Sequence, residues 1–229
     1  MKSALDTVTL KGIYPMTSAK ELATKMADSI NLKSGFLRSF AGGALELPVD
    51  LYYLGYDFLD TDNRWANSID KERCIRLVKR GFANGENLEK IANVIFTRYL
   101  DKVDADKLKN IAINGSASIA GSMVANRLVL GNIGAIFARN LIAKMLIGFS
   151  FATILSIGAV QSRAVYTSRE LSMRDPELYA YLNRLGDLDL LYFLVEKRIR
   201  PFEDATALWS RNRQLFDEVT KYFFQKVRY

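Results

Sequence analysis

The stretch that decides the fold runs from Asn110 to Ser162 and reads NIAINGSASIAGSMVANRLVLGNIGAIFARNLIAKMLIGFSFATILSIGAVQS. It contains no Asp or Glu, and its only charged residues are Arg127, Arg139 and Lys144. An α-helix rises about 1.5 Å per residue and a bilayer core is about 30 Å thick, so roughly 20 apolar residues cross it once. The stretch is therefore long enough for two helical passes and a connection.

The three charges divide this stretch into two uncharged arms. The second arm, residues 145–162, is apolar all round, as a helix in lipid or in a deep core must be. The first arm, residues 110–126, is diluted by Asn, Gly and Ser and is the weaker span. The arm residues that we expect to enter an apolar phase are Ile119, Met123, Leu146, Phe149, Phe151, Ile154, Leu155 and Ile157.

Small residues recur every four positions in both arms. They are Ala112, Ser116 and Ala120 in the first arm and Gly148, Ala152 and Ser156 in the second. Such rows let two helix backbones approach closely, which is how helices associate where lipid gives no hydrophobic drive. We therefore predict that the two arms pack against each other as a helical hairpin.

The connection between the arms, residues 127–144, is basic. Its three cations form the predicted tip of the hairpin, where long side chains reach the membrane interface and avoid the mid-bilayer cost of about 2.5 to 3.5 kcal/mol. Residues that tolerate turns lie within the connection at Gly131, Asn132 and Gly134. Residues 133–142 also suit a short helix.

The rest of the chain is predicted to be helical. Ser18 and Glu21 form a capping box before an amphipathic run to about Lys33, and Pro48 opens an apolar helix to Leu59. Further helices are predicted over residues 68–79, from Asn84 through Tyr99, from Pro176 to Gly186, from Asp187 to about Arg198, and after Pro201.

These patterns predict an all-α fold, a multi-helix bundle with a central apolar helical hairpin. Residues 1–109 form an amphipathic helical region, residues 110–162 the hydrophobic hairpin, and residues 163–229 a second helical region. We expect these three regions to make one compact domain. The glycine pair at positions 42 and 43 is a candidate hinge for opening it.

Enzymatic chemistry finds little support in the sequence. The chain has no histidine, which removes the commonest general base and the usual zinc ligand. Two carboxylate pairs remain: Asp60 with Asp62, and Asp187 with Asp189. The first pair lacks the glycine and the bidentate Glu of a calcium loop and is read as a solvated turn, whereas Asp187 is read as a helix cap. We expect no catalytic residue, metal or cofactor.

The net charge of +7 favours an anionic partner. The densest basic run comprises Lys71, Arg73, Arg76, Lys79 and Arg80, with Glu72 among them. These residues fall around much of a helix, which is typical of a solvated face, so we expect lipid and not nucleic acid as the partner. The single cysteine, Cys74, is predicted to be a small core residue.

The layout of amphipathic helices around an apolar hairpin resembles that of channel-forming colicins and other small pore-forming antibacterial toxins. In that family a water-soluble helical bundle shields a hairpin that enters the inner membrane of a target cell. The resemblance is one of organisation, since here the hairpin is central and its connection is basic.

The resemblance implies a pore-forming or membrane-depolarising toxin or effector that acts at a target inner membrane. The first 16 residues lack the apolar region of a secretory signal, so we expect a protein that is soluble in the producer cytoplasm. Its implied partners are the target lipid bilayer and an immunity protein or delivery chaperone, with oligomers forming on the membrane. Two alternatives stay open: a resident two-span inner-membrane protein such as an immunity or secretion component, and a soluble helical adaptor with an unusually apolar core.

Overall fold

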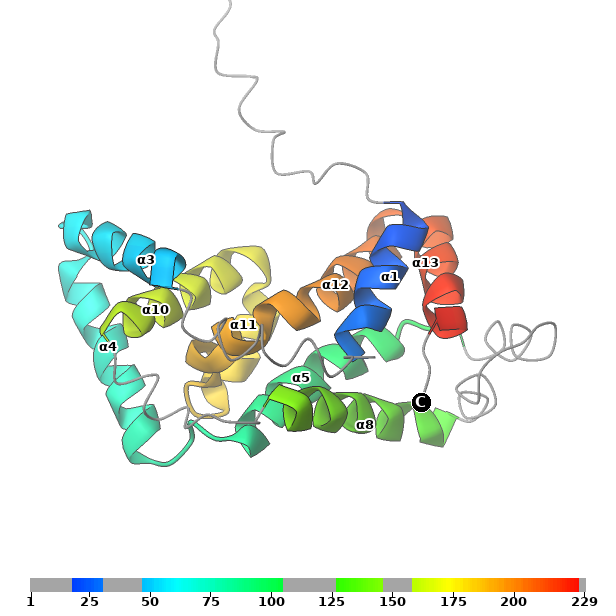
Figure 1. Cartoon of the computed structure of the whole chain (residues 1–229), viewed down its shortest axis with the longest axis horizontal. Coiled ribbons are helices and arrows are strands. Elements are labelled where there is room, and N and C mark those ends of the chain that lie inside the picture. The colour runs from blue at the N-terminus through cyan, green and yellow to red at the C-terminus, as the bar shows by residue number, and fades with distance from the viewer. Residues whose placement is uncertain (1–17, 31–46, 105–126, 146–157, 227–229) are drawn as a thin grey trace, which may run out of the picture.

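The computed structural model describes residues 18–30, 47–104, 127–145 and 158–226. Its helices are α1 (Ala19–Ile30), α3 (Leu47–Leu59), α4 (Arg64–Lys79), α5 (Gly85–Leu100), α8 (Arg127–Met145), α10 (Gly158–Arg174), α11 (Pro176–Arg184), the 3₁₀ helix η2 (Leu188–Leu191), α12 (Tyr192–Arg211) and α13 (Arg213–Lys226). No strand occurs in these ranges, and the helices pack as a bundle (Figure 1). The predicted all-α class is confirmed.

Local capping sets several helix starts where the sequence predicts them. The Ser18 hydroxyl accepts a hydrogen bond from the Glu21 amide at 3.2 Å, and α1 begins at the next residue after Ser18. The Asn84 side chain accepts from the Asn87 amide at 2.9 Å and caps α5. Pro176 occupies the first position of α11, where its missing N–H would have no partner in any case.

The end of α4 is fixed by a glycine turn. Gly81 has a φ of +70°, and its amide donates to the carbonyl of Val78, while the amide of Phe82 donates to the carbonyl of Leu77. This pair of bonds is a Schellman motif, which satisfies helix-end carbonyls and favours glycine at the left-handed position. The chain therefore reverses sharply between α4 and α5.

Two predicted helix boundaries are wrong. Pro201 does not separate two helices, because α12 runs through it as far as Arg211. A proline inside a helix costs about 3 kcal/mol. Pro201 and Phe202 are both buried in the core, and this packing outweighs the cost. Helix α4 begins at Arg64, earlier than predicted, since Asn67 in its first turn is buried and hydrogen-bonded to other helices.

The main core lies where α5, α8, α12 and α13 meet. Phe96 of α5 makes edge-to-face contacts with Phe137 of α8 and Phe202 of α12, with ring centroids 5.8 and 4.7 Å apart. Tyr99 and Phe223 extend this aromatic cluster to α13. Such pairs contribute about 0.5 to 1.5 kcal/mol each beyond their buried area. Helix α1 packs on α12 and α13, so N- and C-terminal segments share this core (Figure 1).

A second group of packed helices lies at the opposite end of the molecule, where α3, α4 and α11 contact α10. Figure 1 shows α3 and α4 together at this end, far from α1 and α13. Tyr166 of α10 stacks on Tyr53 of α3 at 6.0 Å and meets Tyr56 edge to face at 4.9 Å. Helix α10 is therefore the platform on which α3 is held.

Candidate functional site

The predicted arm residues lie outside the described residues. This holds for the membrane-entering set, Ile119, Met123, Leu146, Phe149, Phe151, Ile154, Leu155 and Ile157, and for the packing set, Ala112, Ser116, Ala120, Gly148, Ala152 and Ser156. The glycine pair at 42 and 43 also lies outside them. What the structure describes is the connection between the arms and the last five residues of the second arm, 158–162, which form the start of α10.

The connection is one helix, α8, which spans Arg127–Met145. The predicted turn at Gly131 to Gly134 is therefore wrong, and the helical alternative extends further in both directions than residues 133–142. Gly134 serves helix packing and not a turn: a Cβ there would lie 3.1 Å from Oγ1 of Thr97 and 3.2 Å from Oδ1 of Asn93. The glycine lets α8 approach α5 closely.

One face of α8 is buried against the bundle. Ile133, Phe137, Leu141 and Ile142 are almost completely inaccessible, and α5 is the main partner of the helix. Arg127 and Lys144, the outer members of the predicted basic tip, fall near the two ends of α8.

The third cation of the predicted tip lies on the solvent side of α8. The side chain of Arg139 is 78% exposed, and its Nε lies 3.6 Å from Oε1 of Glu89. Exposed pairs of this kind contribute about 0 to 1 kcal/mol. The apolar face of α8, and not its charge, holds the helix on α5.

The second arm ends inside α10, which begins at Gly158, and the first turns of α10 are hydrogen-bonded to α3. The Ser162 hydroxyl donates to Oδ2 of Asp57 at 3.2 Å, and Nη1 of Arg163 lies 3.4 Å from Oδ1 of Asp50. Ser162, Arg163 and Asp50 are all buried. The end of the strong arm and α3 therefore meet at one fixed junction.

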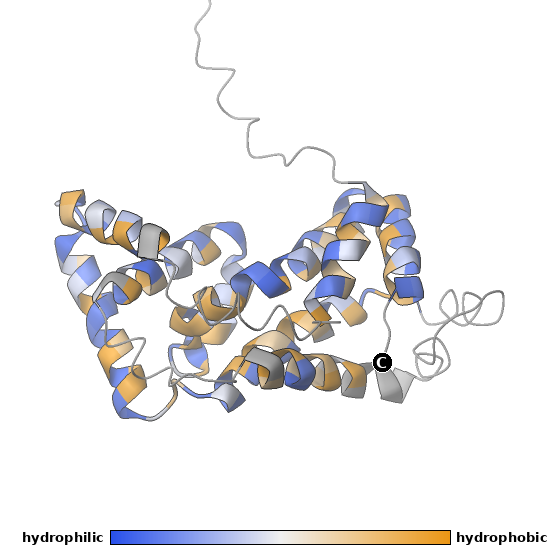
Figure 2. Cartoon of the chain, viewed as in Figure 1, coloured by the Kyte–Doolittle hydropathy of each residue, from blue (hydrophilic) through white to orange (hydrophobic). Residues whose placement is uncertain are grey.

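Helix α3 turns its apolar side outward. Its outer face consists of Leu51, Tyr52, Leu54, Tyr56, Phe58 and Leu59, all of them exposed. Figure 2 shows apolar residues along α3 at the periphery of the molecule. Sequence analysis missed this surface. One signal was present: the two acids of α3, Asp50 and Asp57, lie on a different side of the helix from Leu51 and Phe58.

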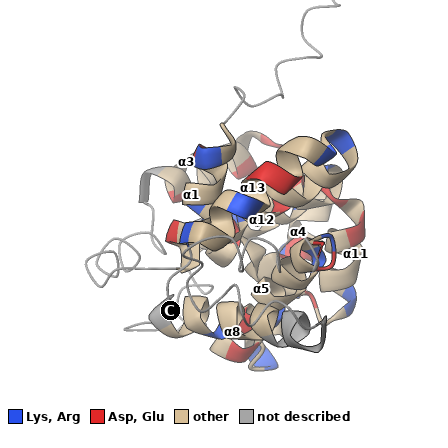
Figure 3. Ribbon diagram, turned by 90° about the vertical axis from the view of Figure 1, so that its right-hand side faces the viewer, with Lys and Arg blue, Asp and Glu red and all other residues tan. Residues whose placement is uncertain are grey.

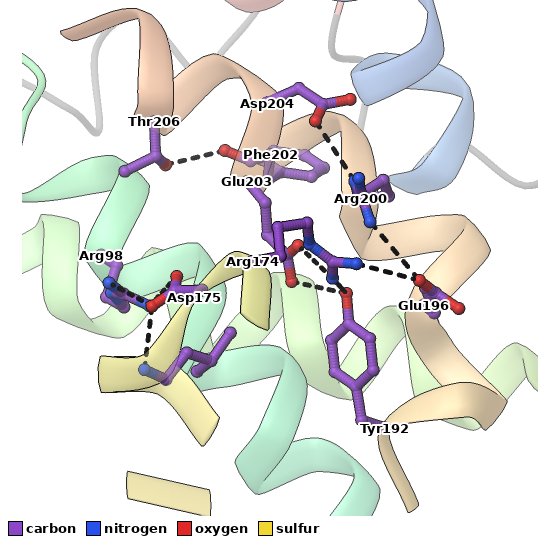
Figure 4. A network of polar contacts seen from close by, with 11 residues as sticks. Arg98, Arg174, Asp175, Tyr192, Glu196, Arg200, Phe202, Glu203, Asp204 and Thr206 are labelled. Carbon is purple, nitrogen blue, oxygen red and sulfur yellow. Dashed lines mark hydrogen bonds and ion pairs between the residues drawn. The ribbon is translucent and has the colours of Figure 1, made fainter. Parts of the chain in front are cut away.

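A polar network joins the end of α10 to α12 (Figure 4). Nη2 of Arg174 donates to Oε2 of Glu203 at 3.0 Å and to the hydroxyl of Tyr192 at 2.6 Å, and that hydroxyl donates to Oε1 of Glu203 at 2.8 Å. Nη1 of Arg174 and Nη1 of Arg200 each lie 3.5 Å from Oε1 of Glu196. Two guanidinium groups thus face two carboxylates.

Burial shifts the ionisation of this network. Loss of hydration raises the pKa of Glu203 and that of Glu196 above the ordinary value of 4.5, although Arg174 acts in the opposite direction on both. Burial likewise raises the pKa of Tyr192, and the charge of Glu203 adds to that rise. Because each carboxylate is matched by a guanidinium, the network fastens two helices together.

The second predicted carboxylate pair belongs to another buried network. Asp187 lies at the N-cap position of η2 but makes no capping hydrogen bond, so its predicted capping role is wrong. Its Oδ1 instead accepts from Nε of Arg73 at 2.7 Å, and Asp189 accepts from Nη2 of the same residue. Arg73 is buried and Lys71 pairs with Asp57, so neither belongs to a solvated face.

Neighbouring positions of α4 follow the sequence more closely. Arg76, Lys79 and Arg80 are exposed, as predicted for a solvated face. Cys74 is buried, which confirms its predicted place in the core, and burial raises the pKa of its thiol to about 12.

The first predicted carboxylate pair is split. Asp62 is exposed, whereas Asp60 accepts from Nδ2 of Asn63 at 2.8 Å and from the hydroxyl of Tyr166 at 2.9 Å. The hydrogen bond from Asn63 lowers the pKa of Asp60 most, with Tyr166 contributing. Asp60 therefore links the turn between α3 and α4 to α10, and only Asp62 lies in a solvated turn.

The described helices carry surface charges of both signs. Figure 3 shows Lys and Arg interspersed with Asp and Glu over the end formed by α1, α12 and α13. Within the described ranges, none of the helices combines the length and the apolarity needed to cross a bilayer. Comparisons of the chain with known protein families, with curated proteins and with solved structures give no match.

Proposed function

We propose that the protein is a pore-forming or membrane-depolarising antibacterial toxin or effector whose two uncharged arms enter a target inner membrane. The observation that supports the proposal is the position of α8. It joins the two arms, it carries the cations Arg127 and Lys144 near its two ends, and it is held on the bundle by one apolar face. In the proposed mechanism, α8 holds the hairpin on the bundle in water, and release of α8 lets the hairpin enter the membrane.

Release of α8 is the step that separates these two states. Ile133, Phe137, Leu141 and Ile142 are buried against the bundle. At about 1.5 to 3 kcal/mol for each large side chain, exposing the four to water costs roughly 6 to 12 kcal/mol. Lipid replaces protein as the apolar surroundings of these side chains, so most of that cost falls away in a bilayer.

The membrane potential adds a second contribution. A cation that moves across the membrane toward a negative interior gains about 2.3 kcal/mol per 100 mV, so the three cations Arg127, Arg139 and Lys144 together gain about 7 kcal/mol at 100 mV. This gain is comparable to the cost of exposing the four buried side chains of α8 to water. The insertion that we propose is therefore dependent on the potential and directed inward.

A reversible crosslink between α5 and α8 tests the proposal. The ideal Cβ of residue 134 lies 3.1 Å from Oγ1 of Thr97, so Thr97→Cys would bring its sulfur close to the Cβ of Gly134→Cys, as a disulfide with an S–S bond of about 2.05 Å requires. Both substitutions are made in a Cys74→Ala background, with each single cysteine as a control. Dye release from anionic vesicles should disappear in the oxidised double variant and return on reduction.

The outcomes of this experiment are distinct. Equal release from the oxidised and reduced double variant would show that α8 stays on α5 during activity. Absence of release and of planar-bilayer current from the native protein, at either sign of the potential, would overturn pore formation itself.

Cellular expression separates the remaining functions. We expect growth arrest with membrane depolarisation only when the protein carries an added export signal, because the arms must meet the target membrane from outside. A resident two-span protein would need detergent for extraction and would be harmless in both settings. A soluble adaptor, which the exposed outer face of α3 favours as the second candidate, would be harmless and would purify without detergent.

A further inference from the structure

The outer face of α3 is apolar because its polar side is fastened inward. Asp50 is buried beside Arg163, and Asp57 accepts hydrogen bonds from Asn67 and Ser162. Rotating α3 to bury its apolar side would remove these acids from their partners and leave buried charges unpaired, which is strongly unfavourable. The exposure of the outer face is therefore built into the fold.

The outer face is large and carries no charge. Phe58 and Leu59 are 76% and 75% exposed, and Leu51 and Tyr52 beside them are exposed by more than half. Trp65, at the start of α4, is 80% exposed and follows Leu59 by six positions in the chain. Contiguous exposed apolar surface of this kind marks an interaction site in a folded protein.

The charges of the adjoining helix α4 and of the turn before it indicate which partner fits the outer face of α3. The exposed charged residues of α3, α4 and the residues that flank α4 are Asp62, Arg64, Glu72, Arg76, Lys79 and Arg80, the last three of them at the far end of α4. Four of these six are cations, because the other acids of this region, Asp50, Asp57, Asp60 and Asp70, are hydrogen-bonded to residues of the bundle. A second copy of the chain would bring cations toward cations, whereas an anionic lipid surface complements them.

The aromatic residues point to the same partner. Tyr and Trp combine an apolar ring with a polar tip and concentrate at the level of lipid headgroups. Tyr52, Tyr56 and Trp65 place three such rings on or beside the apolar surface. A helix with this composition suits the plane of the membrane interface, with its apolar side among the upper acyl carbons.

We infer that the outer face of α3, together with Trp65, is a docking surface for the headgroup region of an anionic bilayer. The choice of a membrane as the partner rests on the proposed function. Docking is a separate step from insertion of the arms: it brings the junction of α3 and α10, from which the second arm departs, to the lipid surface before α8 is released.

Trp65 reports directly on this step. The chain has two tryptophans, so Trp209→Phe leaves Trp65 as the only one. Vesicles with phosphatidylglycerol should shift the emission of Trp65 to the blue, and lipids brominated high on the acyl chain should quench it. Neutral phosphatidylcholine vesicles, or high salt, should weaken binding several-fold because the electrostatic part is lost.

A matched pair of double variants tests the surface itself. Phe58→Ser with Leu59→Ser should lower the vesicle partition coefficient by at least about tenfold, because two large apolar side chains no longer leave water. Met173→Ser with Tyr181→Ser, at exposed positions of α10 and α11, should leave it unchanged. Circular dichroism checks that both variants keep the helical fold.

Each result bears on the docking surface separately from pore formation. Trp65 emission that is unaffected by anionic vesicles would overturn the inference, as would equal partitioning of the two double variants. Self-association of the native protein that Phe58→Ser with Leu59→Ser abolishes, without vesicle binding, would assign the surface to a second copy instead. Vesicle binding with neither dye release nor planar-bilayer current at either sign of the potential would retain the docking surface and overturn pore formation.

Discussion

Nη2 of Arg73 donates to both carboxylate oxygens of Asp189, each at 2.8 Å, inside the bundle. Asp189 is completely buried, and loss of hydration raises its pKa even though Arg73 opposes the rise. Burial lowers the pKa of Arg73 most, but Asp189, Asp187 and Asp70 together raise it above its ordinary value. The pair fixes α4 to η2 across the fold, and the structure depends on both members.

Removal of one member of this pair should destabilise the fold. Asp189→Ala leaves the buried Arg73 with two acids at its other nitrogens, so we expect a loss at the lower end of the range for a broken buried pair, about 3 kcal/mol. Chemical denaturation measures it. Lys25→Ala, which removes an exposed pair with Glu21, is the control and should change stability by less than about 0.5 kcal/mol. A loss below about 1 kcal/mol for Asp189→Ala would contradict the structural role.

Alanine substitutions at three glycines measure the cost of backbone strain and the cost of a steric clash separately. Gly186 has a φ of +105°, and a Cβ there would lie 2.6 Å from Cε2 of Phe82. Gly81 has a φ of +70° with open space around it, and Gly55 lies within α3 with open space as well. Gly55→Ala should stabilise by about 0.5 to 1 kcal/mol, whereas Gly81→Ala should cost about 1 to 2 kcal/mol.

Gly186→Ala should cost more than Gly81→Ala, because Phe82 must also move. Thermal unfolding of the three alanine variants gives the order directly. Equal melting temperatures for the variants at positions 81 and 186 would mean that Phe82 does not pack where the structure places it.

A buried hydroxyl pair predicts a non-additive result. The hydroxyl of Tyr99 donates to Oγ1 of Thr220 at 3.0 Å, and both residues are buried. Thr220→Val leaves the tyrosine hydroxyl without its acceptor and should cost about 1 to 3 kcal/mol. The double variant Tyr99→Phe with Thr220→Val should recover much of that loss in denaturation measurements. If the two losses simply add, the hydrogen bond is absent in solution.

The raised pKa of Glu203 predicts a particular pH dependence. Its folded-state pKa exceeds the ordinary value of 4.5. In the pH interval between these two pKa values, the folded protein binds more protons than the unfolded chain. The contribution of Glu203 to stability therefore falls as pH rises through this interval. Glu203→Gln removes this dependence, so the stability of the native protein minus that of the variant should decrease as pH rises from about 4.5 toward neutral.

Urea titrations at several pH values across that range measure the difference. Glu218→Gln, at an exposed position of α13, is the control and should show no such trend. A difference that grows with pH would mean that the Arg174 network keeps Glu203 ionised more readily than in the unfolded chain.

Local signals in the sequence were sufficient for several helix starts and for the fold class. Ser18, Asn84 and Pro176 act within one turn of their own helices, so their effect does not depend on distant residues. The burial of Cys74 followed from its residue type. Pro201 and Asp187 are exceptions among such signals, because distant partners decide whether a helix tolerates a proline and whether an aspartate pairs with an arginine.

The sequence by itself determined the all-α class, the capped helix starts and the acid-free stretch with its two arms, since composition, periodicity and capping are properties of neighbouring residues. Tertiary structure decided that the connection between the arms is a helix seated on α5, that Arg73 meets Asp189 across 116 positions of the chain, and that α3 faces outward. The physical reason is that buried charges must find partners wherever packing brings them together. On α3, the acids found theirs on α10 and α4, and the apolar side was left to the surface.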